Sequence, residues 1–507
     1  MFLGLDCSTQ SFSALIIDAR KGTIAHEASV SFENDLPHYQ TSSGFVHGDQ
    51  PGEVFSDPLM WVEALDLLLS RLVENGADLA SITAVAGSGQ QHATVYLNEK
   101  FATTLAHLDS TNCLKDQLAP CLTRPLSPIW MDSSTGDECE EIATAIGGND
   151  ELCRRTGSIA IKRFSGAQIR RFSKIAPDAW QNTATVHLNS SFFASILAGN
   201  SVSIDHGDGA GMNLLNLSSG DWDADVLQAT APHLADKLPP VAPSSTIVGN
   251  IAPYFVEKYQ FNPEAKAVLW SGDNPCSLVG MGAASPGKMV ISLGTSYTLF
   301  AAMDQPLTDP QGFGHVFGNP CGKFMSLICF QNGTLAYQKV KEAQSLSWQD
   351  FDVQALTPPT AGDTPTLPFL EPEITPLATA SSQENTSIRS LLDGQFLSMR
   401  QHSDWMGTPA DTIYVTGGGS QSKGICQTIA NVFNASVQGL ETNSSAGLGA
   451  AMRAAHATGE FTLESLETNF CQPTAGSRVT PDPEAVTTYQ SLATTFQSLL
   501  NQHLSTN

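Results

Sequence analysis

Two similar short segments, one early in each half of the chain, constrain the fold more than any other feature. Residues 5–11 read Leu-Asp-Cys-Ser-Thr-Gln-Ser, and residues 292–298 read Ser-Leu-Gly-Thr-Ser-Tyr-Thr. Each lies between two apolar stretches, a pattern that predicts a β-hairpin whose tip carries small hydroxyl residues and backbone N–H groups. One such hairpin is an ordinary turn. A similar hairpin in each half indicates a duplicated fold.

The rest of the sequence predicts strands that alternate with helices, which is typical of an α/β protein. The predicted strands are residues 2–6, 12–18, 23–30, 82–86, 267–270, 288–292, 297–302 and 411–416. The predicted helices are residues 58–72, 424–433 and 447–456, and residues 355–388, rich in Pro, Thr and Ala, are expected to form a loop.

The chain has 507 residues, enough for two or three domains of roughly 150 residues each. The most plausible boundary between the two halves lies at residues 244–250. We therefore expect an N-terminal lobe at 1–250 and a C-terminal lobe at 251–507.

The charge balance excludes several classes of function. The chain has 25 Lys and Arg against 50 Asp and Glu, a net charge of −25, and only 15% of its residues are charged. Such an acidic chain repels phosphate backbones and anionic lipids, so we expect neither nucleic acid nor a membrane as its partner. Any phosphate that it handles must be held by backbone N–H groups, a metal ion and a few cations.

Cysteine usage and the N-terminus indicate a soluble cytoplasmic protein. The ten cysteines are scattered without a Cys-x-x-Cys pair, which argues against a zinc ribbon, a catalytic dithiol or a disulfide scaffold. The first residues show neither the basic region nor the apolar run of a signal peptide. No apolar stretch approaches the ~20 residues that span a bilayer.

Four features carry chemistry. The chain has no P-loop, no His-Glu-x-x-His, no Gly-x-Ser-x-Gly and no dinucleotide-binding glycine motif after its first strand. What remains is Asp6 at a strand end before a Ser/Thr turn, Asp273 at a strand end after a glycine, the Gly294-Thr295-Ser296 turn, and a triple glycine at 417–419. Taken singly, each also has an ordinary reading as turn or loop chemistry.

Taken in order, these features resemble the phosphate and adenosine motifs of the superfamily that joins sugar kinases, actin and the heat-shock chaperone ATPases. More specifically, the chain resembles the FGGY family of carbohydrate kinases, and within it the xylulokinases of animals. The resemblance covers nearly the whole chain. It is carried by residues 6–10 (Asp-Cys-Ser-Thr-Gln), 89–92 (Gly-Gln-Gln-His), 130–135 (Trp-Met-Asp-Ser-Ser-Thr), 163–166 (Arg-Phe-Ser-Gly), 208–215, 272–275 (Gly-Asp-Asn-Pro), 292–296 and 333–334.

The resemblance implies a two-lobed, ribonuclease H-like duplicated fold with the ligand cleft between the lobes. It implies ATP-dependent phosphorylation of D-xylulose to D-xylulose 5-phosphate, with ATP and Mg²⁺ as cofactors. Kinases for another ketose or polyol, such as ribulose or glycerol, are the alternatives within enzymes. A catalytically silent sugar- or nucleotide-binding protein is the alternative outside them. Both a monomer and a homodimer stay open.

The resemblance also assigns roles to residues. Asp273 is the expected general base and Asp6 the expected ligand of Mg²⁺, through water. The expected sugar contacts are His92, Arg163, Asp273 and Asn274, and the expected ATP contacts are Thr9, Thr295, Trp348, Gly417, Gly418, Gly419 and Ser422. Asp132 and Asp208 lie in family motifs without an assigned role.

Three positions depart from the family pattern. Ser8 stands where Gly is usual in the first phosphate motif, and Ser13 stands where Lys or Arg is usual. Ser422 stands where many relatives have Asn. In the first motif, backbone N–H groups are expected to take over from the missing cation.

Overall fold

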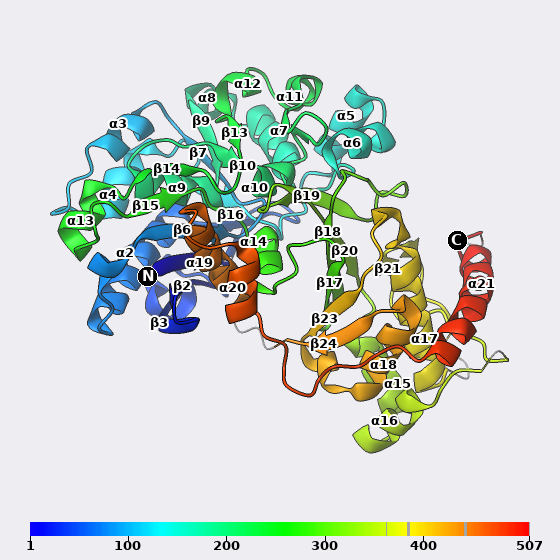
Figure 1. Cartoon of the computed structure of the whole chain (residues 1–507). Coiled ribbons are helices and arrows are strands. Elements are labelled where there is room, and N and C mark those ends of the chain that lie inside the picture. The colour runs from blue at the N-terminus through cyan, green and yellow to red at the C-terminus, as the bar shows by residue number, and fades with distance from the viewer. Residues whose placement is uncertain (361, 383–385, 441–443, 506–507) are drawn as a thin grey trace. The chain divides into compact units, whose positions relative to one another are not determined.

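Both predicted hairpins are present, and each begins a β-sheet in the computed structural model (Figure 1). In the first, β1 (Phe2–Cys7) pairs antiparallel with β2 (Ser11–Asp18), and β6 (Ala84–Gly89) lies parallel to β1. In the second, β17 (Lys288–Leu293) pairs antiparallel with β18 (Tyr297–Met303), and β23 (Thr412–Thr416) lies parallel to β17. A further parallel strand follows in each sheet, β15 (Lys266–Val268) or β24 (Ser436–Gly439). The repeated pattern confirms the duplicated α/β fold.

The structure describes residues 1–360, 362–382, 386–440 and 444–505. The chain forms two compact units. Unit 1 contains Met1–Gly282, Val316–Phe324 and Ser444–Cys471, and unit 2 contains Ala283–His315, Met325–Asn443 and Gln472–Asn507. The expected boundary at residue 250 therefore moves to Gly282. The reason is that β15 and β16 (Ser271–Gly272) add to the first sheet, which makes the segment after residue 250 part of unit 1.

The main sheet of unit 1 has the strand order β14 (Ile247–Asn250), β15, β6, β1, β2 and β3 (Thr23–Ser31), and β16 also pairs with β6. Short strands outside it are β4 (Val46–His47), β5 (Val54–Ser56), β7 (Thr94–Leu97), β8 (Ser127–Pro128), β9 (Thr185–Leu188), β10 (Ile204–Asp205), β11 (Leu215–Asn216), β12 (Asp221–Trp222) and β13 (Val241–Ala242). The helices of unit 1 are α1 (Phe32–Asp35), α2 (Pro58–Glu74), α3 (Lys100–Ala106), α4 (Leu114–Leu118), α5 (Gly136–Ile146), α6 (Asn149–Thr156), α7 (Ser165–Ile175), α8 (Pro177–Asn182), α9 (Asn189–Ala198), α10 (His206–Ala210), α11 (Ala224–Thr230), α12 (Leu234–Lys237), α13 (Pro253–Tyr259), α14 (Asp273–Gly280), α19 (Ser445–Ala457) and α20 (Leu463–Phe470).

Helix α2 shows how the local sequence sets an element. The Asp57 side chain accepts a hydrogen bond from the Leu59 N–H (2.8 Å), and Pro58 occupies the first helical position, where its missing N–H costs nothing. Apolar residues at helical spacing, among them Leu65, Leu68 and Leu72, are fully buried. Burying one leucine stabilises the fold by about 1.5–3 kcal/mol. Packing of this face therefore fixes α2 on the sheet.

In unit 2 the strands follow the order β20 (Lys323–Phe330), β18, β17, β23 and β24, and β19 (His315–Asn319) precedes β20 in the chain. The helices are α15 (Thr334–Ala343), α16 (Trp348–Leu356), α17 (Ile388–Gln401), α18 (Lys423–Phe433) and α21 (Pro483–Ser505). The described residues between α16 and α17 hold only two short strands, β21 (Glu373–Ile374) and β22 (Leu377–Ala378), as the loop prediction for 355–388 anticipates.

Helix α19 comes from the far end of the chain and packs on the first sheet of unit 1 (Figure 1). Glycines allow this close approach. A Cβ placed on Gly4 of β1 would lie 2.1 Å from the Gly447 carbonyl oxygen, and one on Gly280 of α14 would lie 1.9 Å from that of Ser445. The small-residue run that predicted this helix is therefore the surface by which it meets β1 and α14.

Replacing Gly4 with Ala should destabilise unit 1 by about 1–3 kcal/mol, since the added methyl group would meet helix backbone that cannot rotate away. Thermal unfolding measures the effect. Gly136→Ala is the control, because a Cβ there would make an ordinary contact 3.6 Å from Lys162 Cε. Equal melting temperatures for the two variants would show that α19 has room to shift.

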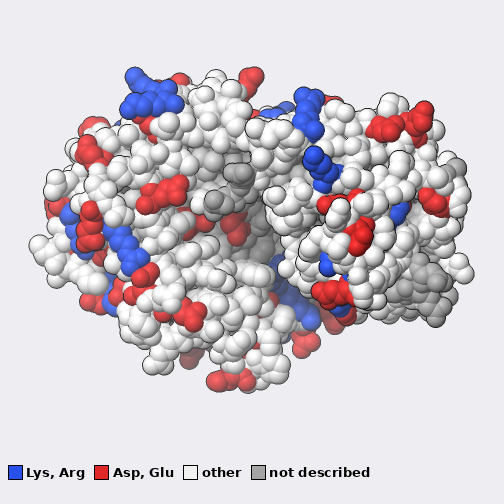
Figure 2. Space-filling view, turned by 90° about the horizontal axis from the view of Figure 1, so that it is seen from below, with Lys and Arg blue, Asp and Glu red and all other residues white. Residues whose placement is uncertain are grey.

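One face of the molecule is in keeping with the low share of charged residues, 15%. On the face shown in Figure 2, acidic and basic side chains lie in small separate groups on a largely uncharged surface. No helix in the described part of the chain is both long enough and apolar enough to cross a bilayer.

Candidate functional site

Three parallel strand ends of unit 1 bring the candidate polar residues together. Asp6 near the end of β1 lies opposite Ser88 of β6, and Ser271 of β16 lies on the other side of Ser88. The chain continues from β6 into residues 90–92 and from β16 directly into Asp273. In open α/β sheets, ligands bind at the carboxyl ends of the strands, where these residues lie.

Asp273 is half-buried at the start of α14 and is held by its neighbours. Its Oδ1 accepts hydrogen bonds from the Asn274 backbone N–H (2.8 Å) and side-chain Nδ2 (3.1 Å). Asn274 Nδ2 also donates to Gln91 Oε1 (2.6 Å). Burial raises the pKa of Asp273 to about 6, while the backbone N–H groups of Asn274 and Gln91 limit the rise. The result is a carboxylate that is ionised at pH 7 yet more basic than a free one, which suits a general base.

Asp6 is half-buried on β1, and its Oδ1 is a buried atom without a hydrogen-bond partner. Burial raises its pKa to about 7, the Ser88 hydroxyl opposes this, and the charge of Asp273 raises it further. A buried, unpartnered carboxylate oxygen fits a hard cation such as Mg²⁺. Among the described residues no group of three His, Cys, Asp or Glu side chains could hold a metal. Mg²⁺ is often bound by one or two carboxylates, with phosphate and water completing the shell.

His92 and Arg163 lie at the same end of unit 1. His92 has a positive φ of 69°, its ring stacks on Phe164 (centroids 4.3 Å apart), and its Nδ1 lies 2.9 Å from the Gly211 carbonyl oxygen. A carbonyl can only accept, so Nδ1 carries a proton, and in the neutral ring Nε2 is then the acceptor. The Arg163 guanidinium lies 5.6 Å from the centroid of the same Phe164 ring. The structure therefore brings His92 and Arg163 together around one aromatic side chain.

The first phosphate turn contains Thr9, whose hydroxyl accepts a hydrogen bond from Trp130 Nε1 (2.8 Å). Ser8, where relatives have Gly, closes the turn, since its N–H and hydroxyl both donate to the Ser11 carbonyl. Ser13 lies opposite Asp6 in the β1–β2 pair. No cation occupies this position, so the turn offers backbone and hydroxyl groups.

Two residues of this region were not assigned from the sequence. Asp208 is buried, with its Oδ2 accepting from Ser190 Oγ (2.5 Å) and its Oδ1 unpartnered. Burial, and then the charge of Asp205, raise the pKa of Asp208 well above its usual range. Gln91 Nε2 is also buried and unpartnered. Both residues lie in segments that the family motifs had singled out. Only the fold reveals that their polar atoms are buried without partners.

Asp132, also unassigned, has a structural role. Its Oδ2 accepts from the Val54 N–H (3.0 Å), and its Oδ1 accepts from Ser134 and from Gln168 Nε2 (2.8 Å). These contacts tie together segments far apart in the sequence.

In unit 2, the second hairpin tip and the triple glycine lie together. Thr295 is exposed at the tip between β17 and β18. Gly417 follows β23 with a φ of 82°, and a Cβ on it would lie 2.8 Å from the Leu293 carbonyl oxygen. Nothing lies within 4 Å of a Cβ on Gly418. Glycine is needed at 417 for the backbone conformation and for this close approach.

Trp348 and Ser422 lie near Gly419, the last glycine of this turn. Tyr337 links two of them, because its hydroxyl would lie 3.3 Å from a Cβ on Gly419 and its ring centroid lies 6.5 Å from that of Trp348. Trp348 is 53% exposed at the start of α16. Ser422 caps α18, accepting from the Ile425 N–H, and donates to Asp352 Oδ1 (2.8 Å). An exposed aromatic ring beside a glycine turn offers a surface for a flat base and a close approach for its ribose.

Most of the chain matches one known protein family. Residues 1–280 match the N-terminal domain of the FGGY family of carbohydrate kinases, and residues 289–458 match its C-terminal domain. Xylulose kinase from Mus musculus is 38% identical over 526 residues, which cover 99% of this chain and 94% of the mouse protein. Xylulose kinase 2 from Arabidopsis thaliana is 38% identical over 489 residues, covering 90% and 87% of the two chains.

Solved structures share the fold at lower sequence identity. Xylulose kinase from Rhodospirillum rubrum superposes with a TM-score of 0.82 at 20% identity, covering 99% of this chain and 98% of that one. Glycerol kinase from Plasmodium falciparum has a TM-score of 0.76 at 16% identity, with the same coverage.

Proposed function

Because the chain belongs to the FGGY family of carbohydrate kinases, we propose that it transfers a phosphoryl group from ATP to D-xylulose, giving D-xylulose 5-phosphate. The observation that carries the choice of sugar is the 38% identity to xylulose kinases over almost the whole chain. The fold cannot carry it, since glycerol kinase shares it. We also propose a cytoplasmic location, which the ten free cysteines support.

The sugar binds, in this proposal, at the strand ends of unit 1. His92 Nε2 accepts a hydrogen bond from a hydroxyl group, and Arg163 and Asn274 donate to sugar oxygens. The Asp273 carboxylate accepts the proton of the attacking hydroxyl as the new bond to phosphorus forms. Its hydrogen bonds to Asn274 hold it in place, so its orientation is set before the sugar arrives.

The nucleotide is held mainly by uncharged groups. Thr9 and Thr295 contribute hydroxyls and turn N–H groups to the phosphates, Gly417, Gly418 and Gly419 allow the adenosine to approach the backbone, and Trp348 and Ser422 contact the base region. Mg²⁺, held by Asp6, would neutralise phosphate charge. Backbone donors and one metal suit a chain with a net charge of −25, which offers few cations.

A panel of sugars tests the proposal. Sugar-dependent ADP release should be fastest with D-xylulose and at least tenfold slower in kcat/KM with ribulose and glycerol. A higher kcat/KM with ribulose or glycerol would identify that compound as the substrate instead of D-xylulose. No sugar-dependent ADP release from folded protein would favour a silent binding protein instead.

The pKa of Asp273 gives a pH dependence. A base must be ionised to work, so kcat/KM for the sugar should be constant above about pH 7 and fall about tenfold per pH unit below about pH 6. At saturating Mg²⁺, which keeps Asp6 ionised, the residual activity of Asp273→Asn should lack this decline. A decline that begins only near pH 4, the value of an unperturbed aspartate, would contradict the assignment.

A further inference from the structure

The strand that leads to Asp273 contains a bulge. Ala267 of β15 pairs with Val85 of β6, and Ser271 of β16 pairs with Ser88. Between these pairs, the three residues 268–270 stand opposite the two residues 86–87. One extra residue therefore interrupts the parallel ladder just before β16. A bulge bends its strand and redirects the side chains that follow, and bulges are common beside active sites.

A buried arginine from α19 fills this interruption. Arg453 is only 4% exposed. Its Nη2 donates to the carbonyl oxygens of Leu269 and Ser244 (2.8 Å each), and its Nη1 donates to that of Gly87 (3.2 Å). Leu269 lies within the bulged segment 268–270, and Gly87 lies in the segment of β6 opposite it. The guanidinium thus bridges β6 and the bulged strand where their own ladder is broken.

Among the described residues, the charge of Arg453 has no carboxylate partner in an ion pair. No carboxylate of the described residues lies within 4 Å of its guanidinium, and its remaining contact is the Cys276 thiol, at 3.4 Å. Burying a charge on carbonyl groups alone is costly. A neutral side chain could fill the space without the free-energy cost of burying a charge. What it could not do is donate to several carbonyl groups at once, as the planar guanidinium of Arg453 does.

Trp270, the last residue of the bulge, is anchored from another helix. Its ring stacks on Phe193 of α9, with centroids 5.4 Å apart. It also fills the place that a side chain at position 87 would take, since a Cβ on Gly87 would lie 2.0 Å from it. The bulge is therefore fixed by α9 through Phe193 and by α19 through Arg453.

We propose that Arg453 is a positioning residue, which holds the bulge and so sets the direction of Asp273 and Asn274. This rests on the proposed function, in which those residues act on the sugar. Asp273 lies only two residues beyond the Ser271 pair and four beyond Leu269, so a change at the bulge carries directly to the carboxylate. The hydrogen bonds of Arg453 go to Gly87, Cys276, Ser244 and Leu269 and not to Asp273 or Asn274.

Replacing Arg453 with Met keeps an unbranched side chain but removes all donors. We expect kcat to fall about 10- to 100-fold. KM for ATP should stay within twofold, because none of the proposed ATP contacts is a hydrogen-bond partner of Arg453. Arg453→Lys, which keeps the charge but not the fork, should lie between Met and the parent. If Arg453→Met does not fold, Arg453→Lys replaces it in each of the experiments that follow.

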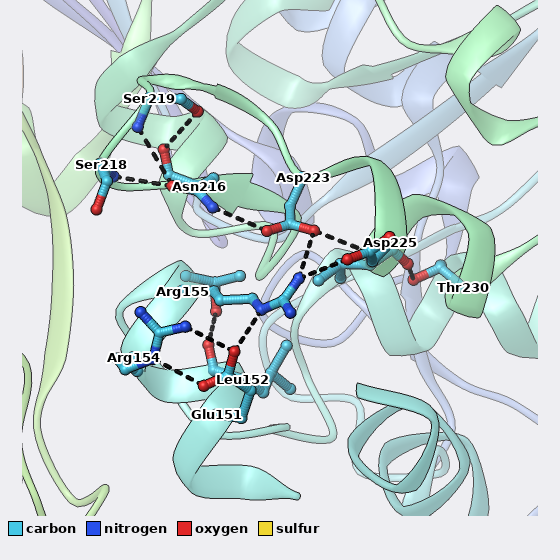
Figure 3. A network of polar contacts seen from close by, with 12 residues as sticks. Glu151, Leu152, Arg154, Arg155, Asn216, Ser218, Ser219, Asp223, Asp225 and Thr230 are labelled. Carbon is cyan, nitrogen blue, oxygen red and sulfur yellow. Dashed lines mark hydrogen bonds and ion pairs between the residues drawn. The ribbon is translucent and has the colours of Figure 1, made fainter. Parts of the chain in front are cut away.

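Arg155→Met is the matched control, since Arg155 is also a partly buried arginine that joins elements of unit 1. It bridges Glu151 of α6 to Asp225 of α11 (2.8 Å to each), as Figure 3 shows. In the same network, Asn216 Nδ2 donates to Asp223 Oδ2 (2.9 Å), and the Asp223 side chain caps α11. Arg155→Met should lower the melting temperature but leave kcat per folded molecule within twofold. Equal falls in kcat for both arginine variants would reduce Arg453 to a general packing role.

A double-mutant cycle decides whether Arg453 acts through Asp273. In an Asp273→Asn background, adding Arg453→Met should lower the residual kcat by less than threefold, because the base to be positioned is already gone. Additive losses would overturn the proposal.

Amide hydrogen exchange of residues 268–274 gives a readout that does not depend on the reaction. Arg453→Met should speed exchange there and Arg155→Met should not, even if the parent proves inactive on every sugar. Unchanged exchange in both would show that the bulge holds without Arg453.

Discussion

Replacing Asp273 with Asn is expected to lower kcat by about 10²–10⁴-fold, the usual contribution of a positioned general base. The amide has the size of the carboxylate and can still bond to Asn274, but it cannot take up the proton of the sugar hydroxyl. The Kd for the sugar, measured by calorimetry, should change little, since binding depends on the other contacts.

Asp132→Asn is the control for this change. It makes the same substitution in a buried carboxylate whose partners are structural: Val54, Ser134 and Gln168. We expect it to lower the melting temperature while kcat per folded molecule stays within threefold. A kcat within threefold of the parent for Asp273→Asn would remove Asp273 from the chemistry.

The second large effect is expected at Asp6. Asp6→Ala should lower Mg²⁺-dependent turnover by about 10³-fold, because loss of a metal that stabilises the transition state costs several kcal/mol and each 1.36 kcal/mol is tenfold. Sugar binding should remain measurable by calorimetry. Asp18→Ala is the control, since Asp18 also ends a strand and accepts from the N–H groups of Arg20 and Lys21. If the two variants kept the same Mg²⁺ dependence as the parent, Asp6 would be a turn residue like Asp18.

The stability of the Asp6 variant separates function from folding. The pKa of Asp6 is raised in the folded chain to about 7, so its ionisation opposes folding, and this cost grows as pH rises from about 4 through 7. At pH 8 without metal, Asp6→Ala should therefore melt no lower than the parent. A lower melting temperature would mean that the carboxylate supports the fold.

Much of the architecture could be predicted from local sequence. The hairpins at 5–11 and 292–298, helix α2 and the strand before the triple glycine were identified because apolar periodicity and turn residues act over a few positions. Strand β6 was predicted to stop at residue 86 but continues to Gly89. Glycine and serine look like a turn in sequence, yet here they are strand residues, since β1 and β16 pair with them on both sides.

The sequence by itself determined the repeated hairpins, the net charge of −25 and the residue types at the strand ends. Only the tertiary structure decided that Asp273 belongs to unit 1, that α19 returns to the first sheet after most of unit 2 has been completed, and that Arg453 enters a bulge 184 residues earlier in the chain. The physical reason is range. Strand and turn preferences depend on neighbouring residues, whereas a buried guanidinium finds its carbonyl partners only after distant segments have packed together.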